Sequence, residues 1–219
     1  MKYYIVLDLE MCQVPSSLKK YVGKSTETIQ FGAVLLDESY RELSSFNRFV
    51  KPQYGILDER ISRMTGIKEE NLANADLFEA VLTELVSWIP EGEVTLISWS
   101  MSDKVQLMKE MAGKKIVNER MQSFFEGWMD SQELFSKKIG NARRYNLEEA
   151  LNLADIQVQG HVHDGYSDAL NTAHLFTKMM TQTQMKWNSY YLNAKTEVEH
   201  LSVSMGELFK NLKLEDGDA

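Results

Sequence analysis

Two acidic side chains stand close together near the start of the chain. Asp8 and Glu10 end the apolar segment that begins at Tyr3, and residues i and i+2 of a β-strand project from the same face. Adjacent carboxylates repel each other, and removing them from water costs several kcal/mol unless a cation compensates. Mg²⁺ and similar hard cations prefer oxygen ligands, so the pair is a candidate metal site. A strand end that reaches solvent and tolerates acids is the alternative.

A third acid, Asp103, follows an apolar segment and precedes a helical pattern. Its carboxylate is either a further metal ligand or a side chain that stabilises the positive end of a helix dipole.

The last candidate group is a histidine followed by an aspartate. Asp168 falls in the first turn of an expected helix, and His163 precedes it beyond Gly165. Five residues along a regular helix rotate a side chain by about 140°, so His163 has to lie on the incoming loop for both to point one way. A loop histidine near metal ions suits a general base. A surface histidine and a helix-capping aspartate are the alternative.

The elements that must position these residues follow from the apolar pattern. Apolar residues on both faces of Tyr3–Glu10 predict a central buried strand. Thr28–Leu36 and about Arg41–Val50 predict two more strands, antiparallel because their connecting turn is short. Residues 94–99 predict a fourth strand, and four helices are predicted at 76–89, 103–111, from 146 and at 167–180. Hairpins followed by alternating helices and strands imply an α/β domain with a mixed central sheet flanked by helices.

Composition narrows the class of protein. The formal net charge is −8, which argues against binding nucleic acid by bulk electrostatics but not against acting on it at a metal-filled site. The only cysteine, Cys12, excludes an internal disulfide framework. No apolar run is long enough for a membrane helix, and acidic residues come too early for a signal peptide. We expect a cytoplasmic protein without membrane contact.

Two segments differ in pattern. Residues 1–182 form the expected catalytic domain, and residues 183–219 form a helical extension with a disordered acidic end. Apolar residues of the extension recur at helical spacing from Val198 to Leu212. This stripe predicts packing on the domain or self-association.

Taken together, the acids and the histidine resemble the DEDDh branch of the DnaQ-like 3′–5′ exonucleases, which have an RNase H-like fold. The order is Asp8-x-Glu10, then Asp103, then His163-x₄-Asp168. Further likeness lies in Glu27–Val34 and in Met64-Thr-Gly-Ile67, and it covers about residues 2–180. The Eri-type and histone-mRNA 3′ exonucleases, with the sporulation-inhibitor relatives, are the nearest branch. The sequence departs from many members at Ser100-Met-Ser-Asp103 and at Met11-Cys12.

The resemblance implies hydrolysis of phosphodiester bonds with two divalent metal ions, Mg²⁺ or Mn²⁺. Asp8, Glu10, Asp103 and Asp168 would hold the ions, and His163 would take the proton of the attacking water. The substrate would be the 3′ end of single-stranded RNA or DNA, and the product a nucleoside 5′-monophosphate.

Substrate contacts are less sharply indicated. The resemblance points to Met11 and Cys12 beside the terminal nucleotide, and Trp99 is a candidate for base stacking. Further stacking candidates are Tyr145 and Tyr166, and candidate phosphate contacts are Lys19, Lys20, Lys24, Arg143 and Arg144. Each has an ordinary alternative, as core packing for the aromatic residues and as solvated surface charge for the basic ones. We expect a structural role for the Cys12 thiol rather than a nucleophilic one.

Two other functions remain open. A non-catalytic binding module on the same fold would be expected to have lost an acid or the histidine, whereas all five are present. A proofreading subunit bound to a polymerase would keep the chemistry and could dock through the C-terminal extension.

Overall fold

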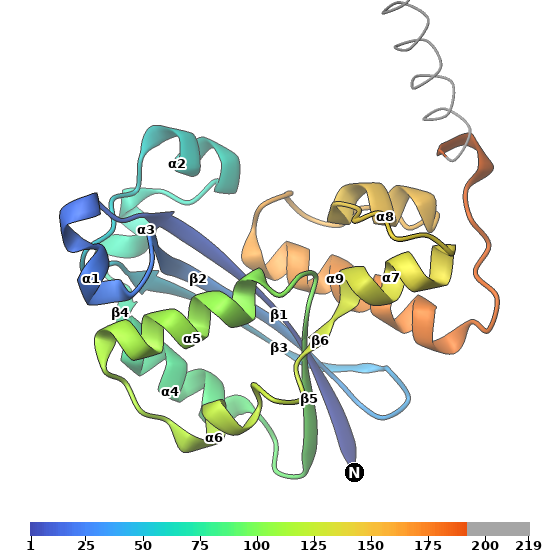
Figure 1. Cartoon of the computed structure of the whole chain (residues 1–219), viewed down its shortest axis with the longest axis horizontal. Coiled ribbons are helices and arrows are strands. Elements are labelled where there is room, and N and C mark those ends of the chain that lie inside the picture. The colour runs from blue at the N-terminus through green and yellow to red at the C-terminus, as the bar shows by residue number, and fades with distance from the viewer. Residues whose placement is uncertain (192–219) are drawn as a thin grey trace, which may run out of the picture.

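A mixed β-sheet forms the centre of the molecule. The computed structural model describes residues 1–191, and within them a six-stranded sheet has the order β4-β3-β2-β1-β5-β6 (Figure 1). The strands are β1 (Lys2–Gln13), β2 (Thr26–Leu36), β3 (Glu42–Lys51), β4 (Asp76–Leu77), β5 (Glu93–Ser98) and β6 (Met129–Asp130). β1 pairs antiparallel with β2 and parallel with β5, so β1 is a central strand as its apolar pattern predicted.

Helices lie between most of the strands along the chain and after the last of them. They are η1 (Ser16–Leu18), α1 (Lys19–Val22), α2 (Glu59–Thr65), α3 (Glu69–Ala73), α4 (Phe78–Trp88), α5 (Ser102–Lys114), α6 (Glu119–Ser123), α7 (Ser131–Ile139), α8 (Leu147–Leu153) and α9 (Gly165–Thr181). No helix in this part of the chain is long and apolar enough to cross a membrane.

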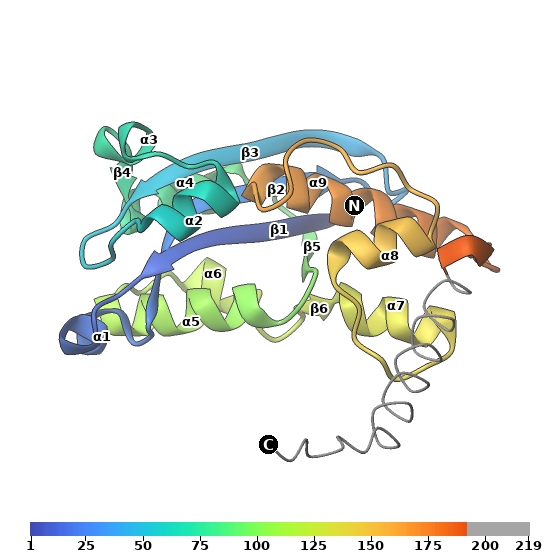
Figure 2. The ribbon, with the colours of Figure 1, turned by 90° about the horizontal axis from the view of Figure 1, so that it is seen from above.

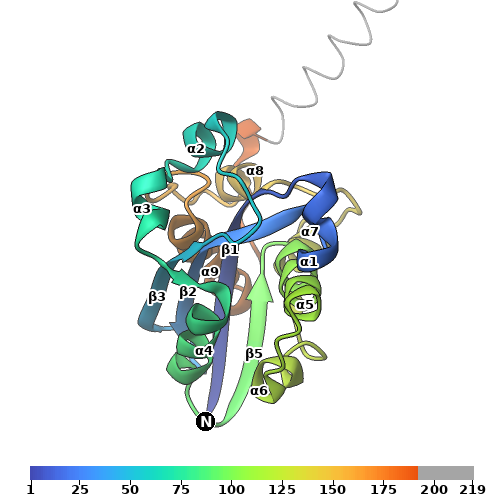
Figure 3. The same ribbon diagram turned by 90° about the vertical axis from the view of Figure 1, so that its left-hand side faces the viewer.

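The two faces of the sheet bury separate hydrophobic clusters. Ile5, Leu7 and Leu9 of β1 contact a cluster that includes residues of α4, α5 and α6. Tyr4 and Val6 face the opposite way, into a cluster with α7, α8 and α9. Figure 1 shows α4, α5 and α6 on one side of β1 and α7, α8 and α9 on the other, and Figures 2 and 3 show the same helices from two further directions. The alternation of β1 therefore assigns its even-numbered residues to the α9 side.

β1 is longer than its neighbour β5, and this difference shapes the site. The parallel pairing stops at Val6 opposite Ile97, while β1 continues to Gln13. Beyond Val6 the edge of β1 toward β5 has no strand partner, so its backbone groups there are available to side chains.

The structure confirms the α/β architecture and most predicted elements. The hairpin from β2 to β3 is antiparallel. The predicted helix at 76–89 begins instead with a two-residue strand, because Asp76 and Leu77 pair with Val50 and Lys51. The elements of the described residues that were not predicted also include α1, α2, α3, α6 and α7, the 3₁₀ helix η1 and the strand β6. The apolar stripe from Val198 to Leu212 and the acidic end lie outside the described residues.

Candidate active site

Asp8 and Glu10 continue the face of β1 that packs against α9. Asp8 lies opposite Gly32 of β2, and Glu10 lies opposite Gln30. A register shift follows between Glu10 and Met11, so the regular alternation ends at the second carboxylate. The two acids thus share one face, as their spacing predicted.

The first turn of α9 lies directly over this part of the sheet, because two glycines allow it. A Cβ on Gly32 would meet the carbonyl carbon of Gly165 at 2.1 Å, far closer than two heavy atoms can approach. Gly165 is the first residue of α9. Any larger residue at position 32 would push this helix, and the side chains of its first turn, away from β1.

His163 and Asp168 meet Glu10 at this junction. One ligand atom each of Glu10, His163 and Asp168 lie within 4.8 Å of one another. His163 lies on the loop before α9 with a φ of 64°, and its backbone N–H donates to Asp168 Oδ2 at 3.1 Å. The loop placement predicted for His163 is therefore confirmed, and the same loop orients the Asp168 carboxylate.

Asp103 approaches from the edge of β1 that β5 leaves free. It lies in the first turn of α5, and its Oδ1 accepts the backbone N–H of Leu9 at 3.2 Å. The side chain takes the place of a missing strand partner by bonding to Leu9, the residue between Asp8 and Glu10 in β1. A helix-dipole role alone does not explain a buried carboxylate bonded to the strand that carries two other acids.

Gln30 and Asp164 also belong to the site, although the sequence argument did not single them out. The Gln30 amide donates to Asp164 Oδ2 at 2.9 Å and to Asn47 Oδ1 at 3.0 Å, and it accepts the N–H of Gly165. Asp164 caps α9 by accepting the N–H of Ser167. A fully buried amide therefore fastens the start of α9 to β2. Its signal in the sequence is a polar residue in an apolar strand.

Burial and mutual repulsion dominate the electrostatics of the cluster. Burial raises the pKa of Asp8 well above its ordinary range, and the charges of Asp103 and Glu10 raise it further. Burial, with the charges of Asp168 and Asp103, raises the pKa of Glu10 to about 9. Burial raises the pKa of Asp103 to about 7, although the Leu9 N–H opposes this. The pKa of Asp168 is also raised by burial, against the effect of His163.

These four acids fit a divalent metal. Among residues 1–191 none of them forms an ion pair with a lysine or arginine, whereas many other acids do. A buried set of carboxylates without a cationic partner is costly unless a cation from solution compensates it. Oxygen-rich sets of this kind suit Mg²⁺ or Mn²⁺ rather than soft metals.

A small cavity adjoins the cluster. Its volume is about 190 Å³, and His163 and Asp168 form part of its wall. The rest of the lining is contributed by α8 and its N-cap, by the loop after α8 and by α9, and consists of Asn146, Leu147, Glu148, Leu151, Val158, Val162 and Asn171. The candidate base thus faces a space with both apolar and polar walls.

Two predicted substrate contacts, Met11 and Cys12, pack in apolar clusters of the fold. Met11 is partly buried against the cluster under α4 and α5. The Cys12 side chain is fully buried among Ile29, Ile61 and other residues next to α2 and α3, so it offers no surface to a substrate. Burial raises its pKa to about 12, which agrees with a structural thiol.

Trp99 is chiefly a packing residue. Its side chain is 9% exposed, packs on Phe135 and donates its indole N–H to the carbonyl of Tyr145. Tyr145 is buried as well, and Tyr166 packs partly buried in the same cluster. Base stacking by Trp99 or Tyr145 would require them to leave these positions.

The candidate phosphate contacts divide into two groups. Arg143 pairs with Glu149 and Arg144 with Asp130. Lys19, Lys20 and Lys24 have no carboxylate partner in the described part of the chain, and Lys24 lies nearest to the acidic cluster, since Asp103 acts on its pKa.

Comparisons with known proteins agree with this geometry. A family model described as exonuclease matches residues 5–176. ERI1 exoribonuclease 2 of Homo sapiens is 28% identical over 202 residues, which cover 81% of this chain and 28% of that protein. DNA polymerase III subunit epsilon of Aquifex aeolicus is 22% identical over 194 residues, covering 86% of each. The chain therefore spans less than a third of the length of the ERI1 exoribonuclease 2 relative.

Solved structures confirm the RNase H-like fold. Cell-death related nuclease 4 superposes with a TM-score of 0.69 and 22% identity, over 85% of this chain and 66% of that one. The nuclease domain of 3′hExo, a DEDDh family member bound to rAMP, gives a TM-score of 0.66 and 20% identity, over 85% of this chain and 96% of that one. Both likenesses extend over most of the described residues.

Proposed function

This chain belongs to the exonuclease family, and from that premise we propose that it removes nucleotides from the 3′ end of single-stranded nucleic acid, releasing nucleoside 5′-monophosphates. One observation carries the proposal. Four carboxylates that have no lysine or arginine partner within residues 1–191 meet a loop histidine at the junction of β1, α5 and α9. Structural acids are usually paired or solvated, so this set is suited to metal-dependent hydrolysis.

The four acids would hold divalent cations, for which we propose two Mg²⁺ or Mn²⁺ ions. Such ions supply charge neutralisation at the phosphate and lower the pKa of water. Asp8 has the central place, since Asp103, Glu10 and Asp168 all act on its pKa. Asp103 is fixed by Leu9 and Asp168 by the backbone of His163, so two of the acids are oriented before any ion binds.

His163 would act as the general base. Its imidazole is exposed and shares the 4.8 Å cluster with Glu10 and Asp168. It can accept a proton from a water held among the acids and pass it to solvent. The protein contributes mainly position and charge, because α9 is seated on β2 through Gly32 and Gln30.

The decisive experiment is cleavage of 5′-labelled single-stranded RNA and DNA oligonucleotides in Mg²⁺, in Mn²⁺ and in chelator. We expect a ladder that shortens from the 3′ end only when metal is present. Asp8→Ala and His163→Ala should abolish or strongly reduce it. His161→Ala is the matched control, because this histidine lies on the same loop outside the 4.8 Å cluster. Cleavage of neither polymer by the folded, metal-loaded protein would refute the proposal.

DNA is a specific second candidate substrate. The chain matches 86% of the length of the Aquifex aeolicus polymerase subunit but only 28% of the human ERI1 relative. A preference for the DNA strand would therefore favour a proofreading role, and a preference for RNA would favour an Eri-type role. A cytoplasmic location, the domain boundary at 182 and self-association through residues 183–219 stay predictions.

A further inference from the structure

Four lysines without acidic partners form a strip beside the candidate active site. They are Lys20 on α1, Lys24 just after it, and Lys109 and Lys115 on and after α5. Within residues 1–191, no ion pair or side-chain hydrogen bond joins any of them to a carboxylate, whereas lysines and arginines elsewhere are often paired, such as Lys2, Arg48, Lys137 and Arg144. In a chain of net charge −8, this basic strip is a local reversal of sign.

The backbone that carries the strip is held in place because α1 lies directly against α5. A Cβ on Gly23 would meet the carbonyl oxygen of Lys109 at 2.6 Å, and one on Gly113 would meet the carbonyl carbon of Val22 at 2.2 Å. Gly23 also has a φ of 74°, which suits glycine. Figures 1 and 3 both show α1 alongside α5. The backbone that carries Lys24 is therefore fixed next to Lys109.

Lys24 lies within electrostatic reach of the acids of the candidate active site. Burial lowers its pKa, and the charge of Lys109 lowers it further, while Asp103 and Glu110 act in the opposite direction. Two like charges thus stand within electrostatic reach of each other at the edge of the acidic cluster. Such a pair is stabilised by an anion that lies between its members.

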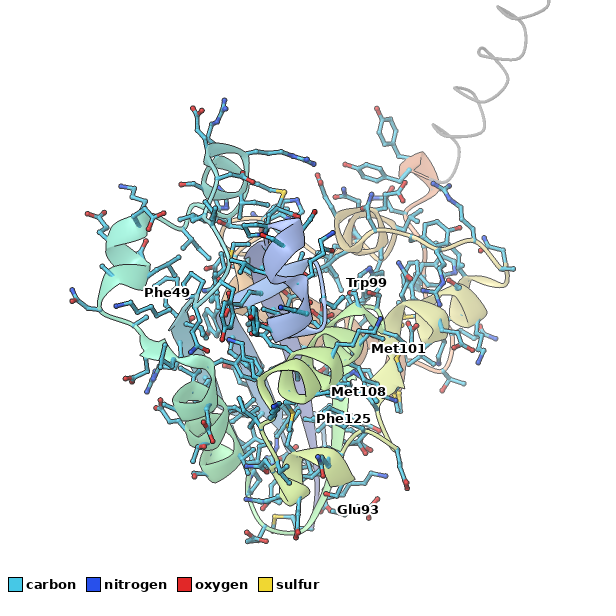
Figure 4. All side chains as sticks on the ribbon, turned by 60° about the vertical axis from the view of Figure 1, so that its left-hand side comes forward. Phe49, Glu93, Trp99, Met101, Met108 and Phe125 are labelled. Carbon is cyan, nitrogen blue, oxygen red and sulfur yellow. The ribbon has the colours of Figure 1, made fainter. Side chains whose placement is uncertain are left out.

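Aromatic residues lie along the same strip. Tyr21 is 43% exposed, stacks on Tyr54 with ring centroids 5.3 Å apart, and has the Lys20 ammonium over its ring at 4.9 Å. A hollow of about 280 Å³ adjoins Tyr21 and Lys115. Along α5, Lys115 lies about 18 Å from Asp103 at 1.5 Å per residue, a span of a few nucleotides. Figure 4 views this side of the molecule, with Met108 labelled on α5 and Trp99 before its start.

We propose that the basic strip binds the phosphate backbone of the substrate strand on the 5′ side of the nucleotide being removed, with Tyr21 as a base-stacking surface. The proposal rests on the proposed function and deepens it. Cations interleaved with an exposed aromatic ring are the means by which proteins hold single strands without reading sequence. Lys24 and Lys109 would hold the phosphates nearest to the acids, and Lys20 and Lys115 those farther along.

Binding can be measured without hydrolysis. The full chain is titrated into a 5′-fluorescent 12-nucleotide single strand in chelator, and anisotropy is followed over a range of salt concentrations. Lys24→Gln/Lys109→Gln should weaken binding roughly tenfold or more at 0.1 M salt and reduce the slope of log K against log salt by about 1.4, since each phosphate contact contributes about 0.7. Tyr21→Leu should weaken binding while leaving that slope unchanged.

The matched control is Lys137→Gln/Lys138→Gln on α7, which makes the same change of charge away from the strip. It should bind like the wild type, and thermal unfolding of every variant verifies that it is folded. An unchanged affinity of the Lys24/Lys109 variant, or an equal loss in the α7 control, would overturn the proposal. Competition by poly-glutamate as effective as that by unlabelled strand would also overturn it, in favour of an acidic protein partner.

Hydrolysis of the strand and its binding by the basic strip are tested separately. Parallel incubation in Mg²⁺ records hydrolysis of the same strand by the wild type. A protein that binds through the basic strip but cleaves nothing refutes the nuclease function alone. A protein that cleaves from the 3′ end with an affinity indifferent to Lys24 and Lys109 refutes the strip alone.

Discussion

Residues 1–191 contain two groups of acids in which carboxylates are buried, and within these residues only one group is paired with a lysine. Glu27 and Glu110 are fully buried, and Lys114, 5% exposed, lies between them at 2.5 Å and 3.2 Å. Glu27 also accepts the backbone N–H groups of Gln53, Tyr54 and Gly55. This group joins β2, α5 and the loop before α2, and nothing about it requires a ligand.

The other group lies at the end of β1 and contains Asp8, Glu10, Asp103 and Asp168. Asp103 accepts the N–H of Leu9 and the Ser102 hydroxyl, and Asp168 accepts the N–H of His163. In the described residues no lysine or arginine forms an ion pair with any of the four acids. Both groups contain buried carboxylates, since Glu10 and Asp103 are buried as Glu27 and Glu110 are, so burial alone does not mark a functional acid. The source of the compensating charge does, because a cluster that lacks an internal cation must obtain one from solution.

The largest loss of activity is expected for Asp8→Asn. It should lower 3′-end cleavage by about 10³-fold or more, since metal-bound charge supplies several kcal/mol and each 1.4 kcal/mol is a factor of ten. In chelator the same variant should unfold at a higher temperature than the wild type, because folding no longer has to protonate the Asp8 carboxyl or bury its charge. Kinetics and thermal unfolding together check this. A variant with lowered stability and full activity would mean that Asp8 has a structural role instead.

Lys114→Met tests the other group. Removing one partner of a buried ion pair leaves an uncompensated charge, and we expect a loss of about 3–5 kcal/mol in the free energy of unfolding, measured with urea. Lys137→Met is the control, because its pair with Glu133 is exposed and should contribute less than about 1 kcal/mol. Equal effects of the two substitutions would remove the distinction between a buried structural pair and a surface one.

Added metal should stabilise the folded protein by binding to the group that contains Asp8, and not to the group that contains Glu110. At a concentration a hundred times the dissociation constant, a cation that binds only the folded protein adds about 2.7 kcal/mol, or a rise of about 5–10 °C in Tm for a chain of this size. Thermal unfolding with and without Mg²⁺ measures the rise. It should persist in Glu110→Gln and vanish in Asp8→Asn. A rise of the same size in both variants would show that the cation binds elsewhere.

The sequence predicted the parts of the site that are local. Asp8 and Glu10 follow from strand periodicity, and the placement of His163 and Asp168 follows from helix geometry. The parts that depend on distant contacts were out of reach. Gln30 bonds to Asp164 across 134 residues of sequence, and no pattern near either residue reports the contact. Cys12 follows the two acids closely, yet the register shift after Glu10 turns the chain into a separate apolar cluster.

The helices and strands likewise could be predicted only where the local apolar pattern is long enough. β1 and α9 have twelve and seventeen residues and show full apolar patterns, and both were predicted. α1, α3 and α6 have at most five residues each, too few for an apolar stripe to repeat. Their formation depends on tertiary packing, as the contact of Gly23 with Lys109 shows for α1.

The smallest expected effect concerns the pH dependence of the group that has its own lysine. Burial alone would raise the pKa of Glu27, but the hydrogen bond and charge of Lys114 and the N–H groups of the loop hold it below its ordinary value. A lowered folded-state pKa gives stability that is complete above the unfolded value of about 4.3 and is lost as pH falls through the folded one. The difference in urea-measured stability between wild type and Glu27→Gln should therefore shrink below about pH 4. A difference that stays constant down to pH 3 would mean that packing, not charge, explains the role of Glu27.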